Sequence, residues 1–279
     1  YDMVRFFERL PDREKESQVT DDGVLMITDT LIIFDNVRHT IKVVACVLTD
    51  GREDIKPLYD EAITKIENIV AILTVPLMKE KPASSENPEI ALESTMHADR
   101  FKEIVAKAKE YIVAGDIIQV VLSQRFQGHT KRHAVDLYRA LRYVNPSPYL
   151  FFLKIDDFYM IGSSPEVLVR MEEGVVELRP IAGTKKRGKN EQQDRELADE
   201  LLNDPKERAE HVMLVDLGRN DLGSIARVGS VQVNQLMVVE RYSHVMHLVS
   251  NIQAHLSADC DAFDIIRATF PAGTLTGAP

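Results

Sequence analysis

Apolar segments paired across very short turns constrain the fold of this chain more than any other feature of its sequence. The two clearest pairs are residues 149–155 with 159–163 and residues 167–171 with 175–181. Turns as short as Asp156-Asp157 connect neighbouring antiparallel strands. Helical spacing of apolar residues occurs between and around these hairpins, at residues 101–112, 134–144, 191–202 and 205–217. The sequence therefore predicts an α+β fold with mostly antiparallel sheets and flanking helices.

The first part of the chain has a pattern of its own. Strands are predicted at 24–34 and 40–48, and an apolar helical stripe begins after Pro57. Residues 75–91 then contain three prolines and two adjacent serines, which is typical of a linker or an exposed loop. Beyond it we expect a helix that ends at Gly115 and a buried strand at 117–122.

The composition argues against several classes of partner. The net charge of −10, from 34 basic and 44 acidic residues, disfavours nucleic acid because phosphate binding requires a basic surface. No apolar run approaches the roughly 18–20 residues of a membrane helix. The two cysteines, Cys46 and Cys260, match no metal-binding spacing. We therefore expect a cytoplasmic protein with no nucleic-acid or membrane partner.

The segment from Asp204 to His211 contains the best candidate for a chemical site. Asp204 and Pro205 suit the start of a helix, and Glu207 and Glu210 are three residues apart, so their carboxylates share one helix face. Such a pair can serve a divalent cation. A structural alternative is equally simple, because Asp204 and Glu207 fit a capping box and acids are favoured in a first helical turn.

Two other patterns have competing interpretations. His244 and His247 fall in a predicted strand at 245–256 or directly before it, where alternation would place them on opposite faces, and a lone histidine there is often a core residue. Glycine loops at residues 181–184 and 273–277 could bind an anion through freed backbone N–H groups. They could equally be plain turns.

Seven motifs follow one another along the chain, at residues 115–126, 145–149, 162–166, 179–184, 204–221, 241–250 and 271–279. Taken together, these motifs resemble the chorismate-utilising enzymes, and among them the catalytic subunits of anthranilate synthases. The resemblance covers nearly the whole chain and is densest after Phe101. It implies a catalytic, chorismate-binding domain at residues 91–279, and the remainder of an N-terminal regulatory part with its linker at residues 1–90.

Two positions distinguish between the reactions that members of this family catalyse. Relatives that add water to chorismate have a lysine base where this chain has Gln119, and aminodeoxychorismate synthases have a lysine where it has Ala182. Glutamine cannot act as that base and alanine cannot form a covalent adduct. The resemblance thus implies direct attack by ammonia and then loss of pyruvate, giving anthranilate for tryptophan biosynthesis. Aminodeoxychorismate synthase, or a non-catalytic module that only binds a partner or tryptophan, stays an alternative.

The resemblance also implies a role for particular residues. Glu210 resembles a ligand of the cofactor Mg²⁺, and Glu207 resembles the general acid that protonates the departing 4-hydroxyl. His247 would assist pyruvate loss. Gly183, Thr184 and Thr274 resemble substrate contacts.

The implied partners are chorismate, a glutamine amidotransferase subunit that supplies ammonia, and tryptophan as a feedback inhibitor. Residues Pro148, Tyr149 and Leu150 match part of the family's tryptophan site. The family's C-terminal segment, with a second glutamate for magnesium, would follow Pro279. We therefore expect a fragment, truncated at both ends, that is inactive alone.

Overall fold

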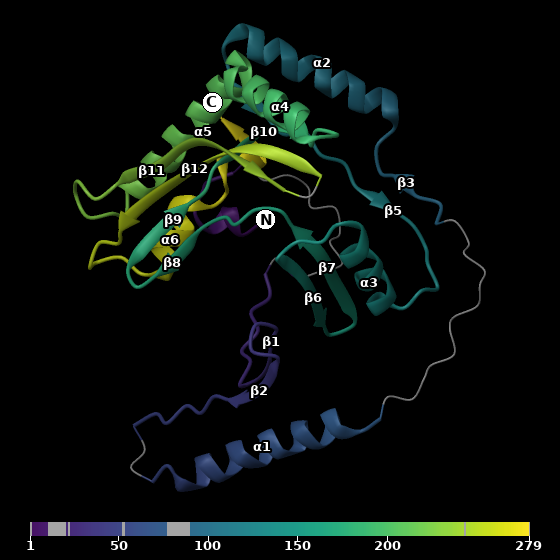
Figure 1. Ribbon diagram of the computed structural model, residues 1–279, viewed down its shortest axis with the longest axis vertical. Coiled ribbons are helices and arrows are strands. Elements are labelled where there is room, and N and C mark those ends of the chain that lie inside the picture. The colour runs from purple at the N-terminus through teal and green to yellow at the C-terminus, as the bar shows by residue number, and fades with distance from the viewer. Residues whose placement is uncertain are drawn as a thin grey trace. The chain divides into compact units, whose positions relative to one another are not determined.

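The described residues of the chain divide into two units. The computed structural model describes residues 2–10, 21, 23–51, 54–76, 90–242 and 244–278. One unit contains Met3–Leu10 and Ile90–Pro279, and the other contains Pro11–Glu89. Figure 1 shows both, coloured along the chain. Each unit is described separately below.

The smaller unit is a hairpin with one helix. Strand β1 (Thr30–Asp35) pairs antiparallel with β2 (Thr40–Ala45), and α1 (Lys56–Thr74) contacts β2. The Asp35 carboxylate accepts hydrogen bonds from the backbone N–H groups of Val37 and Arg38, at 3.2 and 2.9 Å, which fixes the turn. The hairpin was predicted, but β1 begins six residues later than the apolar run that starts at Val24.

A five-stranded antiparallel sheet organises the larger unit. Its strands are β8 (Arg170–Glu172), β9 (Val175–Leu178), β10 (Ile181–Lys186), β11 (Gln232–Arg241) and β12 (Val245–His255). The long strand β12 pairs with β9 and β10 along one edge and with β11 along the other. In the described chain β10 pairs only with β12, so its second edge is open.

Helices cover one face of this sheet. Helix α4 (Glu191–Asn203) and α5 (Pro205–Gly223) both contact β10 and β12, and α6 (Ala262–Thr269) packs on α5 (Figure 1). Alternate residues of β12 point into the core beneath the helices, where Met246, Leu248 and Ile252 are fully buried. Because a core leucine replaced by alanine costs roughly 2–5 kcal/mol, this strand is a main source of the unit's stability.

Further elements complete the larger unit. They are η1 (Asp2–Phe6), β3 (Glu93–Ser94), α2 (Ala98–Ala114), β4 (Gln119–Val120), β5 (Phe126–Gln127), α3 (Ala134–Val144), β6 (Tyr149–Ile155), β7 (Phe158–Ser164), α7 (Gly273–Thr276) and β13 (Gly277–Ala278). β3 pairs with β5, β4 with β13, and β6 with β7, all antiparallel. Gly115 ends α2 with a left-handed φ of +81°, as its sequence position predicted.

The α+β fold with antiparallel sheets is confirmed, while two local predictions were wrong in extent. Of the strand predicted at 117–122, only Gln119–Val120 is a strand, paired with β13, and Ile118 is 62% exposed. The strand predicted near 227 begins at Gln232, after a turn at Gly229. The strand predicted at 245–256 is confirmed as β12, and His244 lies directly before it. Among the described residues no helix is both long and apolar enough to cross a membrane.

Candidate active site

A β-bulge at Gly183 is the geometric centre of the candidate site. Ala182 pairs with Leu248 and Thr184 with the adjacent His247, so Gly183 is an extra residue in β10. Its φ of +66° is one that glycine adopts without strain. A Cβ at this position would lie only 2.9 Å from Leu201 Cδ1 and 3.2 Å from Glu207 Oε2. Glycine is therefore required here both by the backbone and by the space.

Glu207 reaches this bulge from the first turn of α5. The Asp204 side chain caps the helix by accepting from the N–H groups of Lys206 and Glu207, at 2.9 and 3.2 Å. The capping box that the sequence also allowed is not formed, because the Glu207 carboxylate makes no return bond to Asp204 N. It lies beside Gly183 instead. Glu207 is thus half-buried at the bulge and free of a capping role.

Glu210 lies one turn further along α5 and is also half-buried. Within the described part of the chain, neither Glu207 nor Glu210 has a hydrogen bond or ion pair through its carboxylate. Two half-buried acids without a cationic partner suit a hard divalent ion. The described residues contain no group of three or more histidine, cysteine or acidic side chains that could hold a metal by themselves. Any such ion would need further oxygen ligands.

His247 contacts the same bulge through its Nδ1 atom. Nδ1 lies 3.0 Å from the Gly183 carbonyl oxygen and 3.1 Å from Thr184 Oγ1. A carbonyl oxygen only accepts, so in the neutral ring Nδ1 carries the proton and donates it to Gly183. Nε2 is then the basic nitrogen. The ring of Tyr242 packs edge-on against the imidazole, with 5.6 Å between centroids.

Glu207 and His247 approach Gly183 from opposite faces of the sheet. Leu248 points to the helix face, where it packs with Leu201, so its neighbour His247 and the paired Thr184 point to the other face. Glu207 comes from α5, on the helix face. The two faces meet at the open edge of β10. The Gly183 bulge therefore lies between the acid on one face and the imidazole on the other.

The two residues that discriminate within the family lie on different strands. Ala182 is buried, with 8% exposure, next to the bulge in β10. Gln119 is half-buried in β4 and pairs with Ala278. A Cβ on Gly277 would lie 2.2 Å from the Gln119 carbonyl oxygen, and its φ is +119°, so the glycine allows this close approach.

A cavity of about 360 Å³ lies further along α5 and contains acids that the sequence analysis did not assign. Its lining includes Glu166, Asp221 and Gly273. Desolvation raises the pKa of Asp221 to about 6 and raises the pKa of Glu166 as well. Glu166 belongs to the segment 162–166 already noted for its resemblance, and that membership was the only signal in the sequence.

Thr274 belongs to this second region rather than to the bulge. Its neighbours Gly273 and Leu275 line the cavity, and the position of a Gly273 Cβ lies 3.0 Å from Leu217 Cδ1 of α5. Leu217 is ten residues beyond Glu207, or about 15 Å along the helix. The side chain of Thr274 lies outside what the structure describes.

The residues matched to a tryptophan site lie at the start of the β6–β7 hairpin. Pro148 and Tyr149 are exposed, and Leu150 is half-buried. Ser147 Oγ accepts from the backbone N–H of Tyr149 at 3.0 Å and donates to the Ser164 carbonyl oxygen, which fixes the entry to the strand. An allosteric role for these residues stays a prediction.

Comparison with known proteins identifies the family to which this chain belongs. The chorismate binding enzyme family matches residues 1–279, the whole chain, so this chain belongs to that family. A structure at low identity supports the same fold: the menaquinone-specific isochorismate synthase of Escherichia coli aligns with a TM-score of 0.64 at 22% identity, over 80% of this chain and 51% of that one.

Within the family the chain is similar to anthranilate synthase component 1. It is 47% identical to that protein of Aquifex aeolicus and 46% identical to that of Synechocystis, in both cases over 100% of this chain. The crystal structure of anthranilate synthase component I from Streptococcus pneumoniae aligns with a TM-score of 0.79 at 37% identity, over 90% of this chain and 54% of that one. The chain spans 56% and 58% of the two curated relatives.

Proposed function

We propose that this chain is the chorismate-binding part of an enzyme that aminates chorismate with ammonia and then eliminates pyruvate, giving anthranilate. The observation that carries the proposal is the bulge at Gly183, where Glu207, Thr184 and His247 converge at the open edge of β10. Main-chain groups at an unpaired strand edge are free to bind a carboxylate, and chorismate has two.

In the first step, ammonia attacks ring carbon C2, both ring double bonds shift (C1=C2 to C1=C6 and C5=C6 to C4=C5), and the C4–O bond breaks so that the 4-hydroxyl leaves. A proton from Glu207 converts the leaving group to water, and the new ammonium group loses a proton to restore the balance. This role requires an acid that is not already engaged elsewhere. Glu207 fits because it is half-buried and makes no capping bond.

The oxygen ligand that Glu210 offers on α5, one turn after Glu207, suits Mg²⁺. Glu210 would supply one carboxylate oxygen, and the substrate carboxylate would supply more, because a hard cation takes about six oxygen ligands. The bound ion would neutralise charge on the substrate carboxylate. Glu210 is available for this because no described cation pairs with it.

In the second step, His247 removes the C2 proton while the C3–O bond breaks. The departing enolpyruvate takes up a proton and becomes pyruvate, and the ring becomes aromatic. The hydrogen bond from Nδ1 to the Gly183 carbonyl leaves Nε2 as the proton acceptor. Thr184 would hold the substrate beside it through its hydroxyl group.

The neutral residues at 119 and 182 support amination over hydration or covalent catalysis. Gln119 cannot activate water, and the buried methyl group of Ala182 cannot form an adduct. Ammonia would come from a glutamine amidotransferase partner, tryptophan would act as a feedback inhibitor at Pro148–Leu150, and the protein would work in the cytoplasm as a lyase.

The test is product identity. The intact protein should convert chorismate to anthranilate and pyruvate in equal amounts when ammonia and magnesium are supplied, as followed by anthranilate fluorescence and a coupled pyruvate assay. Removal of magnesium with a chelator should stop the reaction. Aminodeoxychorismate as the product, or isochorismate formed without consumption of ammonia, would refute the proposal.

A further inference from the structure

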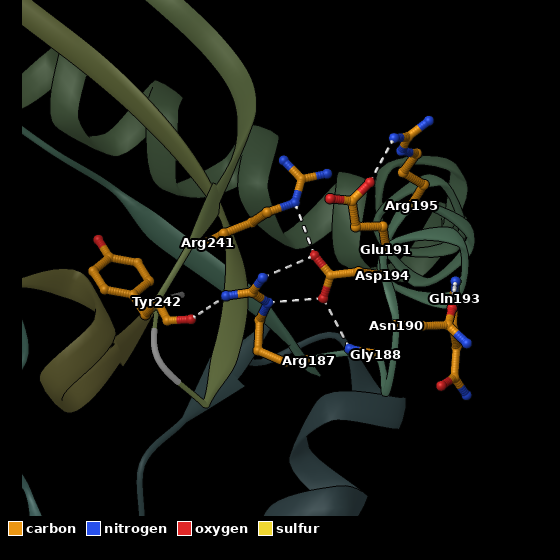
Figure 2. A network of polar contacts seen from close by, with 9 residues as sticks. All are labelled: Arg187, Gly188, Asn190, Glu191, Gln193, Asp194, Arg195, Arg241 and Tyr242. Carbon is orange, nitrogen blue, oxygen red and sulfur yellow. Dashed lines mark hydrogen bonds and ion pairs between the residues drawn. The ribbon is translucent and has the colours of Figure 1, made fainter.

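Asp194 on α4 is a buried carboxylate that binds two arginines. Its side chain is 11% exposed. Oδ1 accepts from Arg187 Nε at 2.7 Å and from Gly188 N at 2.8 Å, and Oδ2 accepts from Arg187 Nη2 at 3.1 Å and Arg241 Nε at 3.2 Å (Figure 2). The Arg187 guanidinium is the main cause that lowers the pKa of Asp194 to about 2. The group is therefore a permanent anion.

Arg187 extends this cluster to the connection between β11 and β12. Its Nη1 donates to the Tyr242 carbonyl oxygen at 2.6 Å, and its backbone N–H donates to the His244 carbonyl oxygen at 3.1 Å. Arg241 is the last residue of β11. The Asp194 cluster, defined as Asp194, Arg187, Gly188 and Arg241, therefore holds this connection from both the β10 side and the β11 side (Figure 2).

The held connection leads directly to His247. β12 begins at Val245, whose carbonyl oxygen accepts from Tyr242 N at 2.8 Å, and His247 is the third residue of the strand. The Tyr242 ring meets the imidazole edge-on, at 65° between planes. The hydroxyl group of Tyr242 also donates to Glu240, at 2.8 Å. The position of Tyr242 thus limits how the imidazole can turn away from Gly183.

We propose that Asp194 is a positioning residue for His247: by fixing Arg187 on the Tyr242 carbonyl, it keeps the imidazole in its Nδ1–H form, with Nε2 presented to the substrate. The catalytic part of this inference rests on the proposed function, whereas the tautomer is a property of the protein alone. Loss of a group that orients a metal-bound histidine typically costs roughly 10–100-fold in affinity or activity, and we expect a loss of the same order here.

The Asp194→Asn variant tests the orientation. One Oδ atom becomes an NH₂ group and meets the Arg187 or Arg241 donors, so the fork on Arg187 is broken. The matched control is Glu191→Gln, which neutralises an exposed acid on the same helix whose ion pair with Arg195 is 3.2 Å long (Figure 2). The readout is the ¹⁵N resonances of the His247 ring nitrogens, assigned with His247→Gln in the intact protein.

The wild type and Glu191→Gln should show the Nδ1–H tautomer, and Asp194→Asn should show a mixture of tautomers. An unchanged Nδ1–H tautomer in Asp194→Asn would overturn the proposal. If Asp194→Asn does not fold, Arg187→Lys serves in its place, because lysine can pair with Asp194 but cannot also reach the Tyr242 carbonyl with a second arm. A mixture of tautomers in Arg187→Lys would support the proposal, and an unchanged Nδ1–H tautomer would overturn it.

The catalytic consequence is a change in partition between the two steps. If His247 is misplaced, anthranilate formation should fall about 10–100-fold while chorismate consumption falls much less, and the aminated intermediate should accumulate. An equal fall in both rates would show that Asp194 only stabilises the fold and would overturn the positioning role. Failure of the wild type to make anthranilate would refute the proposed function, and the ring-nitrogen readout would still decide the Asp194 proposal.

Discussion

Helices α5 and α6 begin with the same sequence pattern and use it differently. Each has an aspartate at its N-cap and an acid three residues later. In α6 the Asp264 carboxylate accepts from Asp261 N at 3.0 Å and completes a capping box. In α5 the Asp204 side chain caps the helix alone, and the Glu207 carboxylate lies beside Gly183. A capping pattern in a sequence therefore does not show whether its second acid is occupied or free for chemistry.

The largest expected difference comes from neutralising the second acid of each helix. Glu207→Gln should slow turnover by about 10²–10⁴-fold with little change in chorismate affinity, because it removes a proton donor and keeps the shape. Asp264→Asn should leave turnover unchanged and lower stability by about 0.3–1 kcal/mol, through loss of charge at a helix N-terminus. Steady-state kinetics and urea unfolding of the two variants measure these effects. Equal kinetic effects would remove the distinction between the helices.

Gly183, which lies beside the Glu207 carboxylate, should be almost as sensitive to substitution. Gly183→Ala should reduce kcat/KM by about 100-fold, since the added methyl must displace Leu201 or the Glu207 carboxylate, and small displacements at a reacting group cost that much. Gly229→Ala is the control, because Gly229 has a similar φ of +77° with nothing within 4 Å of its Cβ position. It should carry the backbone strain without the kinetic loss. Matching losses of activity in both variants would mean that strain alone explains the effect.

A smaller effect is expected at the caps themselves. Asp204→Ala and Asp261→Ala should each lower the free energy of unfolding by about 1 kcal/mol, because each side chain caps two backbone N–H groups. Only Asp204→Ala should also reduce turnover, since it loosens the helical turn that holds Glu207. Chemical denaturation and initial rates measure the two quantities. A reduction of turnover in Asp261→Ala would contradict the assignment.

The smallest effect concerns His211, a fully buried histidine next to Glu210 that has no counterpart in α6. Desolvation lowers its pKa below the ordinary 6.5, so the unfolded chain binds a proton more readily than the folded one. Its contribution to stability is therefore fully present above pH 6.5 and is lost as the pH falls below that value. His211→Gln should flatten this part of the stability profile in urea unfolding at several pH values. If the slope of unfolding free energy against pH is unchanged in His211→Gln, groups other than His211 cause that slope.

Local signals in the sequence predicted much of the fold. The helix at 134–144 has the predicted bounds, and the β6–β7 hairpin forms around Asp156-Asp157. The start of α5 follows from Asp204 and Pro205. These elements are determined by capping, turn chemistry and the spacing of apolar residues, all of which are readable within a few positions.

Features that depend on distant partners were not predictable in the same way. Strand β4 pairs with β13, more than 150 residues later. The bulge at Gly183 exists only in the register between β10 and β12, and the free state of Glu207 depends on that bulge. The link from Asp194 to Tyr242 joins α4 to the end of β11. None of these leaves a local pattern in the sequence.

We expect chorismate to bind at the open edge of β10, and the structure also contains a competing location, the cavity lined by Glu166 and Asp221. A crystal structure of Glu207→Gln with chorismate and magnesium decides between them, because the slow variant should hold the substrate unreacted. We expect the substrate carboxylate and the ion beside Gly183, Thr184 and Glu210. Substrate bound in the cavity, with the bulge unoccupied, would refute binding at the edge of β10.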